Sequence, residues 1–157
     1  MKKENDFYQI SLKVILKNDK GEILLLEANL EGSFAGYYDF PGGRIDTDEF
    51  TTPFYNIIKR EIVEEVGNID FNLNSKPVAV GRHLAPSTIT KKDHDIHVLY
   101  LFFEAQYING EINISNEHIG YKWVDLSKVN PAKLLKSGNL EGIKMYLSKA
   151  KEFKNIS

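Results

Sequence analysis

One segment of this chain reads Arg60-Glu61-Ile62-Val63-Glu64-Glu65-Val66-Gly67, and it follows a glycine turn, Pro41-Gly42-Gly43-Arg44. The three glutamates stand at positions i, i+3 and i+4, so they share one side of any helix that carries them. Like charges at this spacing repel one another by roughly 0.2–0.5 kcal/mol per pair. Such a group beside a glycine turn is typical of a site for hard divalent cations, which prefer oxygen ligands. A carboxylate-held Mg²⁺ in turn indicates a phosphate-bearing substrate.

The glutamates are predicted to lie on a helix that runs from Pro53 to about Val66. Thr52 would be its N-cap, Pro53 its first residue and Gly67 its C-terminal signal. At about 100° per residue, one apolar stripe forms along this helix, and it consists of Phe54, Ile58, Ile62 and Val66. The glutamates lie beside the stripe and not opposite it. We therefore expect them to be partly buried at the rim of the core, which suits a metal site better than a solvated surface.

Length and composition predict one globular domain that spans residues 1–157. The chain has 157 residues, of which 42% are hydrophobic and 27% charged, as in ordinary soluble domains. A net charge of -2 gives no footprint for stable nucleic-acid binding. The sequence contains no cysteine, which excludes disulfides, thiolate zinc sites and cysteine nucleophiles. The polar N-terminus is not typical of a secretory signal, and no apolar stretch approaches the roughly 20 residues of a membrane span. We expect a cytoplasmic protein without membrane contact.

The rest of the chain predicts strands, the helix, further strands and closing helices. In order, the expected elements are strands at 7–16 and 22–27 around a turn at 18–21, a short strand at 37–40, the helix, strands at 77–84 and 96–107, an Asn109-Gly110 hairpin turn into 112–114, a short strand at 123–126, and helices at 131–136 and 140–153 separated by Gly138-Asn139. Loops are expected at 85–95 and 115–122. This order favours an α+β fold over regular βαβ alternation.

The motif resembles the Nudix box, whose pattern is Gly, five residues, Glu, seven residues, then Arg-Glu-apolar-x-Glu-Glu-x-Gly-apolar. Gly43 and Glu49 match its beginning, and residues 60–67 match its core. The resemblance implies an α/β/α sandwich with a mixed β-sheet, in which the box forms a loop, a helix and a loop and the chain ends in one or two helices. It also implies an enzyme that hydrolyses a phosphoanhydride bond in a nucleoside diphosphate-linked substrate. Nucleoside triphosphates, nucleotide sugars such as ADP-ribose and dinucleoside polyphosphates all remain open, and a homodimer is one possible assembly.

The resemblance assigns roles to individual residues. It implies Mg²⁺ or Mn²⁺ held by the Gly42 carbonyl and by Glu61, Glu64 and Glu65. Arg60 would orient the carboxylates, and Glu61 or Glu117 would be the general base; the other reading of Glu117 is an ordinary loop charge. Arg44 and Arg82 are candidate phosphate contacts, although a surface arginine and a packed His83 are equally consistent with residues 82–83. The predicted catalytic residues are thus Glu61, Glu64, Arg60 and Glu117.

Two departures from the pattern bear on these roles. Ten residues separate Glu49 from Arg60 where the family has seven, which leaves the role of Glu49 open. Asn68 stands where the family has an apolar residue, and Ile69 would take over its packing. One alternative is therefore a catalytically weak Nudix-like module that binds nucleotides or regulates. Another, isomerisation of an isoprenoid diphosphate, requires a catalytic cysteine and is set aside.

Overall fold

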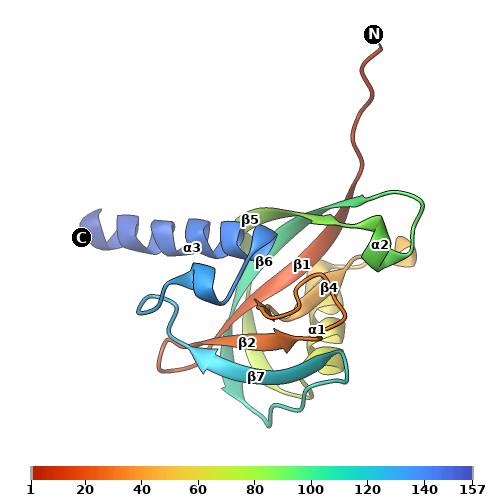
Figure 1. Ribbon diagram of the computed structural model, residues 1–157. Coiled ribbons are helices and arrows are strands. Elements are labelled where there is room, and N and C mark those ends of the chain that lie inside the picture. Colours follow the sequence, from red (N-terminus) through yellow and green to blue (C-terminus); the bar gives the residue numbers. More distant parts are fainter. Residues whose placement is uncertain (1, 157) are drawn as a thin grey trace.

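The computed structural model describes residues 2–156, with side chains through residue 149, and contains one mixed sheet with helices on both of its faces (Figure 1). The strands are β1 (Tyr8–Lys17), β2 (Ile23–Ala28), β3 (Tyr38–Asp39), β4 (Gly42–Arg44), β5 (Asp70–Ala85), β6 (Ile96–Asn109) and β7 (His118–Val124). The helices are α1 (Phe54–Glu65), α2 (Ser87–Thr90) and α3 (Ser137–Ile156), with short 3-10 turns η1 (Thr47–Glu49) and η2 (Pro131–Lys133). Among residues 2–156, no helix combines the length and the apolar character that crossing a bilayer requires.

Strand β1 lies at the centre of the sheet. It runs parallel to β6 and antiparallel to β2 and β4, and β5 and β7 extend the sheet through β6 and β2. Successive side chains of a strand point to opposite faces, and both faces of β1 are buried. Ile15 packs into a cluster that includes Ile143 of α3, whereas Val14 and Leu16 pack into a second cluster with Ile58 and Ile62 of α1. The predicted α+β class and α/β/α sandwich are therefore confirmed.

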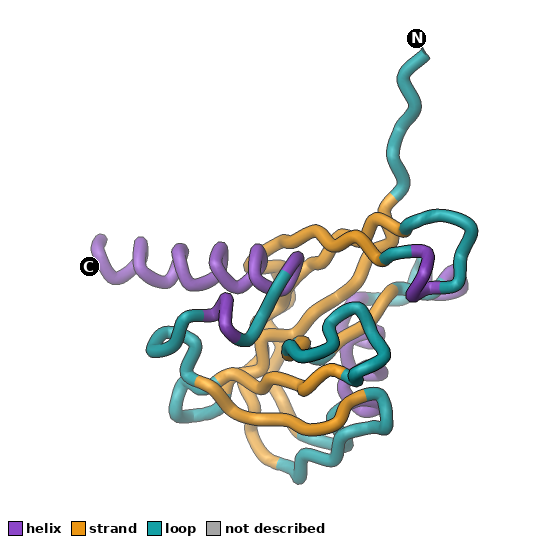
Figure 2. Tube along the Cα trace, viewed as in Figure 1, coloured by secondary structure: helices purple, strands orange, loops and turns teal. Residues whose placement is uncertain are grey.

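The predicted Asn109-Gly110 hairpin is wrong. Strand β6 has β5 along one edge to its end at Asn109 and β1 along the other edge as far as Gln106, so a returning strand could pair with no more than its last three residues. Residues 110–117 form no strand and run as a loop between β6 and β7 (Figure 2). Their backbone bonds instead to the end of α1, where the Asn113 N–H donates to the Val66 carbonyl at 2.7 Å.

Other boundaries move because of pairing over long distances. Strand β5 begins at Asp70, earlier than the predicted residue 77, because its first residues pair with the end of β6. The predicted loop at 115–122 is wrong in its second half, where β7 begins at His118 and pairs with β2. The loop expected at 85–95 contains the short helix α2.

The ends of two helices also differ from the prediction. Pro53 has an extended ψ of 140° and is itself the N-cap of α1, so the prediction of Thr52 as N-cap is wrong. The Thr52 N–H donates instead to the Glu49 carbonyl at 2.9 Å, within the loop that the extra residues form. Helix α3 begins at Ser137, so Gly138 and Asn139 lie in its first turn and do not separate two helices. The expected helix at 131–136 is the short turn η2.

Candidate functional site

The glycine turn is held against both β1 and α1. Gly42 has a φ of +135°, and a Cβ there would lie 1.9 Å from the Leu12 carbonyl oxygen, so only glycine fits. The Gly42 N–H donates to Glu65 Oε2 at 2.9 Å. A Cβ at Gly43 would lie 2.5 Å from the Glu61 carboxylate. The two glycines therefore let the turn approach the glutamates of α1 at close range.

The three glutamates of α1 differ in burial. Glu65 is 8% exposed and the Glu61 side chain 12%, whereas the Glu64 side chain is 58% exposed. Partial burial at the rim of the core is thus confirmed for Glu61 and Glu65, and the prediction is wrong for Glu64. The reason is geometric, since Glu65 and Glu61 point towards the turn while Glu64 stands further out, beside Arg60.

These groups open onto one pocket of about 520 Å³. It is lined by Gly42, Gly43, Arg44, Asp46, Glu61, Glu64, Glu65, Ser115 and Glu117. The loop after β6 brings Glu117 here, because the Ser115 N–H donates to the Glu65 carbonyl at 3.2 Å. The structure thus brings together every predicted metal ligand, Arg44 and Glu117.

Arg60 lies at the centre of an acidic cluster. Its guanidinium is 2.6 Å from Glu49, 3.0 Å from Glu61, 3.2 Å from Glu64 and 3.9 Å from Asp46. The residues that lengthen the box form a loop on the surface, in which Phe50 is 92% exposed. Because this loop points outwards, it does not separate Glu49 from Arg60. Glu49 therefore lies against the arginine of the box despite the longer spacing.

Burial and repulsion act on the carboxylates of the pocket. Burial raises the pKa of Glu65 to about 8, although nearby Lys13 and the Gly42 N–H act in the opposite direction. Burial also raises the pKa of Glu61, with Arg60 opposing the change and Glu64 adding to it. Arg60 is a single cation surrounded by four carboxylates, so negative charge is in excess in this cluster. An excess of oxygen donors in a partly dehydrated pocket is the donor set that Mg²⁺ and Mn²⁺ prefer.

A second ionic cluster lies behind the turn, and the sequence did not predict it. Lys13 Nζ is 2.9 Å from Asp39 Oδ1, and the same oxygen accepts a hydrogen bond from Asn139 Nδ2 of α3 at 2.8 Å. Burial disfavours the Lys13 ammonium, but Asp39, Tyr100 and Glu65 outweigh it and raise the pKa of Lys13. The available signal was a single lysine inside the apolar run of β1.

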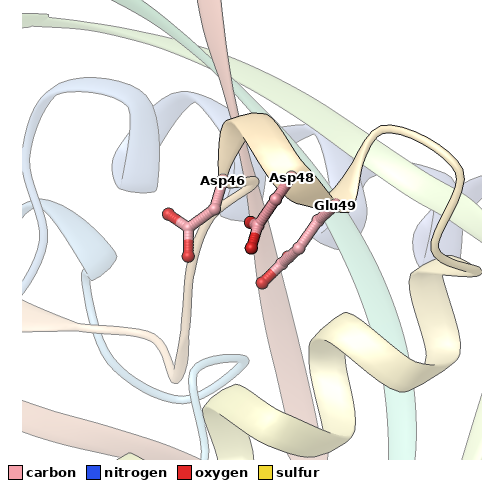
Figure 3. Close-up of side chains that lie close together, drawn as sticks. All are labelled: Asp46, Asp48 and Glu49. Atoms are coloured by element: carbon pink, nitrogen blue, oxygen red, sulfur yellow. The ribbon is translucent and has the colours of Figure 1, made fainter.

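Three acidic side chains lie close together at η1 and its N-cap Asp46, and of these the sequence indicated Glu49 alone. Asp46, Asp48 and Glu49 place carboxylate oxygens within 4.8 Å of one another and point to the same side of the turn (Figure 3). Asp46 also lines the pocket. The feature of the sequence that could have indicated Asp46 is its position two residues after the glycine turn Pro41–Arg44.

Arg82 does not line the pocket. It is 69% exposed, and its Nε lies 3.8 Å from Glu141 of α3. The neighbouring His83 is a packed histidine, stacked on Phe34 with ring centroids 4.7 Å apart and 2.9 Å from the Ser137 hydroxyl.

Comparisons with known proteins agree on one family. The family model described as the NUDIX domain matches residues 7–146. The nucleoside triphosphatase NudI of Shigella flexneri is 26% identical over 111 residues, which are 70% of this chain and 77% of that protein. A MutT protein from Methanosarcina mazei Go1 has a crystal structure that matches with a TM-score of 0.68 and 25% identity, over 94% of this chain and 96% of that one. An ADP-ribose pyrophosphatase from Streptococcus suis matches in fold with a TM-score of 0.60 and 19% identity, over 92% of each chain.

Proposed function

This chain belongs to the Nudix family, and from that premise we propose that it hydrolyses a phosphoanhydride bond of a nucleoside diphosphate-linked substrate with the help of Mg²⁺ or Mn²⁺. The observation that carries the proposal is the pocket in which three α1 glutamates and Glu117 meet the glycine turn. The family predicted from the motif is confirmed, and with it the class of enzyme, a Nudix-type pyrophosphohydrolase.

The residues of the pocket fit a divalent metal ion. Glu61, Glu64, Glu65 and the backbone of Gly42 would hold it, and Arg60 would keep Glu61 and Glu64 in place through the contacts at 3.0 and 3.2 Å. A bound Mg²⁺ neutralises charge on phosphate oxygens and makes a bound water more acidic. Arg44 lines the same pocket and is the cation available there to meet a phosphate.

The chain's own groups would then serve the reaction in order. Arg44 would bind the diphosphate of the substrate. The α1 carboxylates repel phosphate by themselves, so their part would be to hold the divalent ion that offsets their charge. A water molecule attacks one phosphorus, the bond from that phosphorus to the bridging oxygen breaks, and the leaving phosphate takes the electron pair. We assign acceptance of the proton from water to Glu117, because Glu61 is already engaged by Arg60 whereas Glu117 is exposed and faces the pocket. General-base catalysis of this kind contributes about 10²–10⁴-fold to a rate.

Nucleoside triphosphates are the first substrate class to test. Support comes from the similarity to the Shigella protein named a nucleoside triphosphatase. A nucleotide sugar such as ADP-ribose is the second class, since the Streptococcus suis protein of the same fold is named for that substrate.

The test is incubation with Mg²⁺ and a panel of nucleoside triphosphates, dinucleoside polyphosphates and nucleotide sugars, with products resolved by chromatography. The proposal predicts cleavage that EDTA abolishes and that Glu64→Gln reduces strongly. Glu117→Gln should lower kcat by at least about 10²-fold while the affinity for Mn²⁺ stays unchanged. Intact substrates throughout, with nucleotides still bound, would favour the non-catalytic module.

A further inference from the structure

A groove larger than the glutamate pocket lies directly beside it. Its volume is about 1030 Å³, and it shares two lining residues, Arg44 and Asp46, with the glutamate pocket. Small-molecule sites typically enclose about 300–1,000 Å³. A molecule whose phosphates lie at Arg44 can therefore extend into this groove without leaving the surface of the protein.

One residue of the stretch inserted into the box, Phe50, lines the groove. Phe50 belongs to the stretch that lengthens the box, and its side chain is 92% exposed. Phe54, at the start of α1, and Tyr8, at the start of β1, also line the groove and are 43% and 42% exposed. The Phe54 ring packs edge-on against Phe103, with ring centroids 6.0 Å apart, and the Tyr8 ring packs against His97, with ring centroids 5.5 Å apart. Three aromatic side chains thus surround one hollow, two of them held by the core or the sheet.

The charges along the groove indicate which part of a substrate it accepts. Among the described residues that line the groove, Arg44 is the one cation, and it stands at the boundary with the glutamate pocket. The other charged groups are the carboxylates of Asp46, Asp48 and Glu49. Carboxylates repel phosphate and accept hydrogen bonds from amino and hydroxyl groups. The groove therefore suits an uncharged ring system that carries N–H or O–H donors.

We propose that this groove binds the nucleobase of the substrate, with Phe50 as a stacking surface that the insertion supplies. Every nucleobase has a flat π face, and stacking on an aromatic side chain tolerates different bases. The base would lie in the groove, the phosphates at Arg44 and the scissile bond beside the glutamates. The proposal rests on the proposed function, since it places one part of the same substrate.

The first test compares the kinetics of Phe50→Ala with those of the wild type and of Phe7→Ala. Phe7 is a matched control because it is 88% exposed and does not line this groove. Loss of one stacking contact should raise KM for a nucleoside triphosphate roughly tenfold and leave kcat within about twofold. Phe7→Ala should behave as the wild type. An unchanged KM for Phe50→Ala would overturn the proposal, and a dimer that dissociates in that variant would then assign the groove to a second copy of the chain.

The second test does not depend on turnover. Phe50→Trp is made in the Glu64→Gln background and titrated with a nucleoside triphosphate or with inorganic tripolyphosphate, both with Mg²⁺. Glu64→Gln alone gives the background from Trp123. Quenching by the nucleotide and not by tripolyphosphate supports the groove as the base site. No quenching at nucleotide concentrations where calorimetry shows binding, or equal quenching by both ligands, would overturn it. If the wild type hydrolyses no nucleotide, the proposed function fails, and this titration still decides the groove.

Discussion

Two ionic clusters hold the two ends of the glycine turn, and they differ in how their charges balance. Upstream of the turn, Lys13 meets the single carboxylate of Asp39, and both side chains are largely buried at 7% and 18% exposed. Downstream, Arg60 meets four carboxylates, which range from 12% to 66% exposed. The first cluster is closed and neutral, whereas the second is open and carries excess negative charge.

The difference separates structural from functional use of the same residue types. A buried pair such as Lys13–Asp39 contributes little net stability but costs a great deal when one partner is removed. The guanidinium of Arg60 cannot balance the charge of four carboxylates, so binding a further cation from solution would relieve their mutual repulsion. The turn Pro41–Arg44 thus lies between a buried ion pair whose charges balance and the Arg60 cluster, in which carboxylates outnumber the single cation.

The largest expected effect is on stability, and it tests the closed cluster. Lys13→Met leaves the Asp39 carboxylate buried without its cation, and we expect the free energy of unfolding to fall by about 3–5 kcal/mol. Urea denaturation measures this change. The double variant Lys13→Met with Asp39→Asn should recover part of the loss, because no uncompensated charge remains. If Lys13→Met unfolds at the same urea concentration as the wild type, Lys13 and Asp39 do not form a buried ion pair that the fold depends on.

The next effect concerns pH and the buried carboxylate of Glu65. Its pKa is raised from 4.5 to about 8 in the folded protein, so between these values the folded state holds more protons than the unfolded state. Stability of the metal-free protein should therefore fall as pH rises through this window, by on the order of 4 kcal/mol. Glu65→Gln should remove most of the slope, because glutamine does not titrate and still accepts the Gly42 N–H.

Thermal unfolding from pH 5 to pH 8.5 in EDTA checks this expectation. Mg²⁺ should flatten the curve of the wild type, because a bound cation keeps Glu65 ionised. A wild-type curve that rises over this range would contradict the assigned direction.

The smallest effect tests whether Glu49 still supports Arg60 despite the insertion. Glu49→Gln removes the charge that lies 2.6 Å from Arg60, so Arg60 is free to shift relative to Glu61 and Glu64. Loss of such a supporting contact typically costs 10–100-fold in metal affinity or activity, and we expect the lower end, about tenfold in kcat/KM. Asp48→Asn on the same turn is the matched control, since no ion pair joins Asp48 to Arg60 in the described part of the chain. Equal effects of the two variants would show that Glu49 has lost its role.

Much of the glutamate pocket, which shares Asp46, Glu61 and Glu64 with the open cluster, could be predicted from the sequence because its order is local. Glu61, Glu64 and Glu65 share one helix face by spacing alone, and a Gly-Gly turn signals close approach of backbone. The closed cluster could not be predicted, because Lys13 and Asp39 are 26 residues apart and Asp39 and Asn139 are 100 apart. The predicted hairpin at Asn109-Gly110 is wrong for a related reason. Its local turn preference could not outweigh a sheet in which both edges of β6 are already paired as far as Gln106.

The central claim is that the excess carboxylates beside the glycine turn bind a divalent cation. Calorimetric titration of Mn²⁺ into the wild type, Glu61→Gln and Asp48→Asn tests it most directly. We predict saturable binding by the wild type, at least about tenfold weaker binding by Glu61→Gln, and binding by Asp48→Asn that matches the wild type. Absence of Mn²⁺ binding by the wild type, or a loss in Asp48→Asn that Glu61→Gln does not share, would contradict the account and move the cation to the η1 turn or out of the protein.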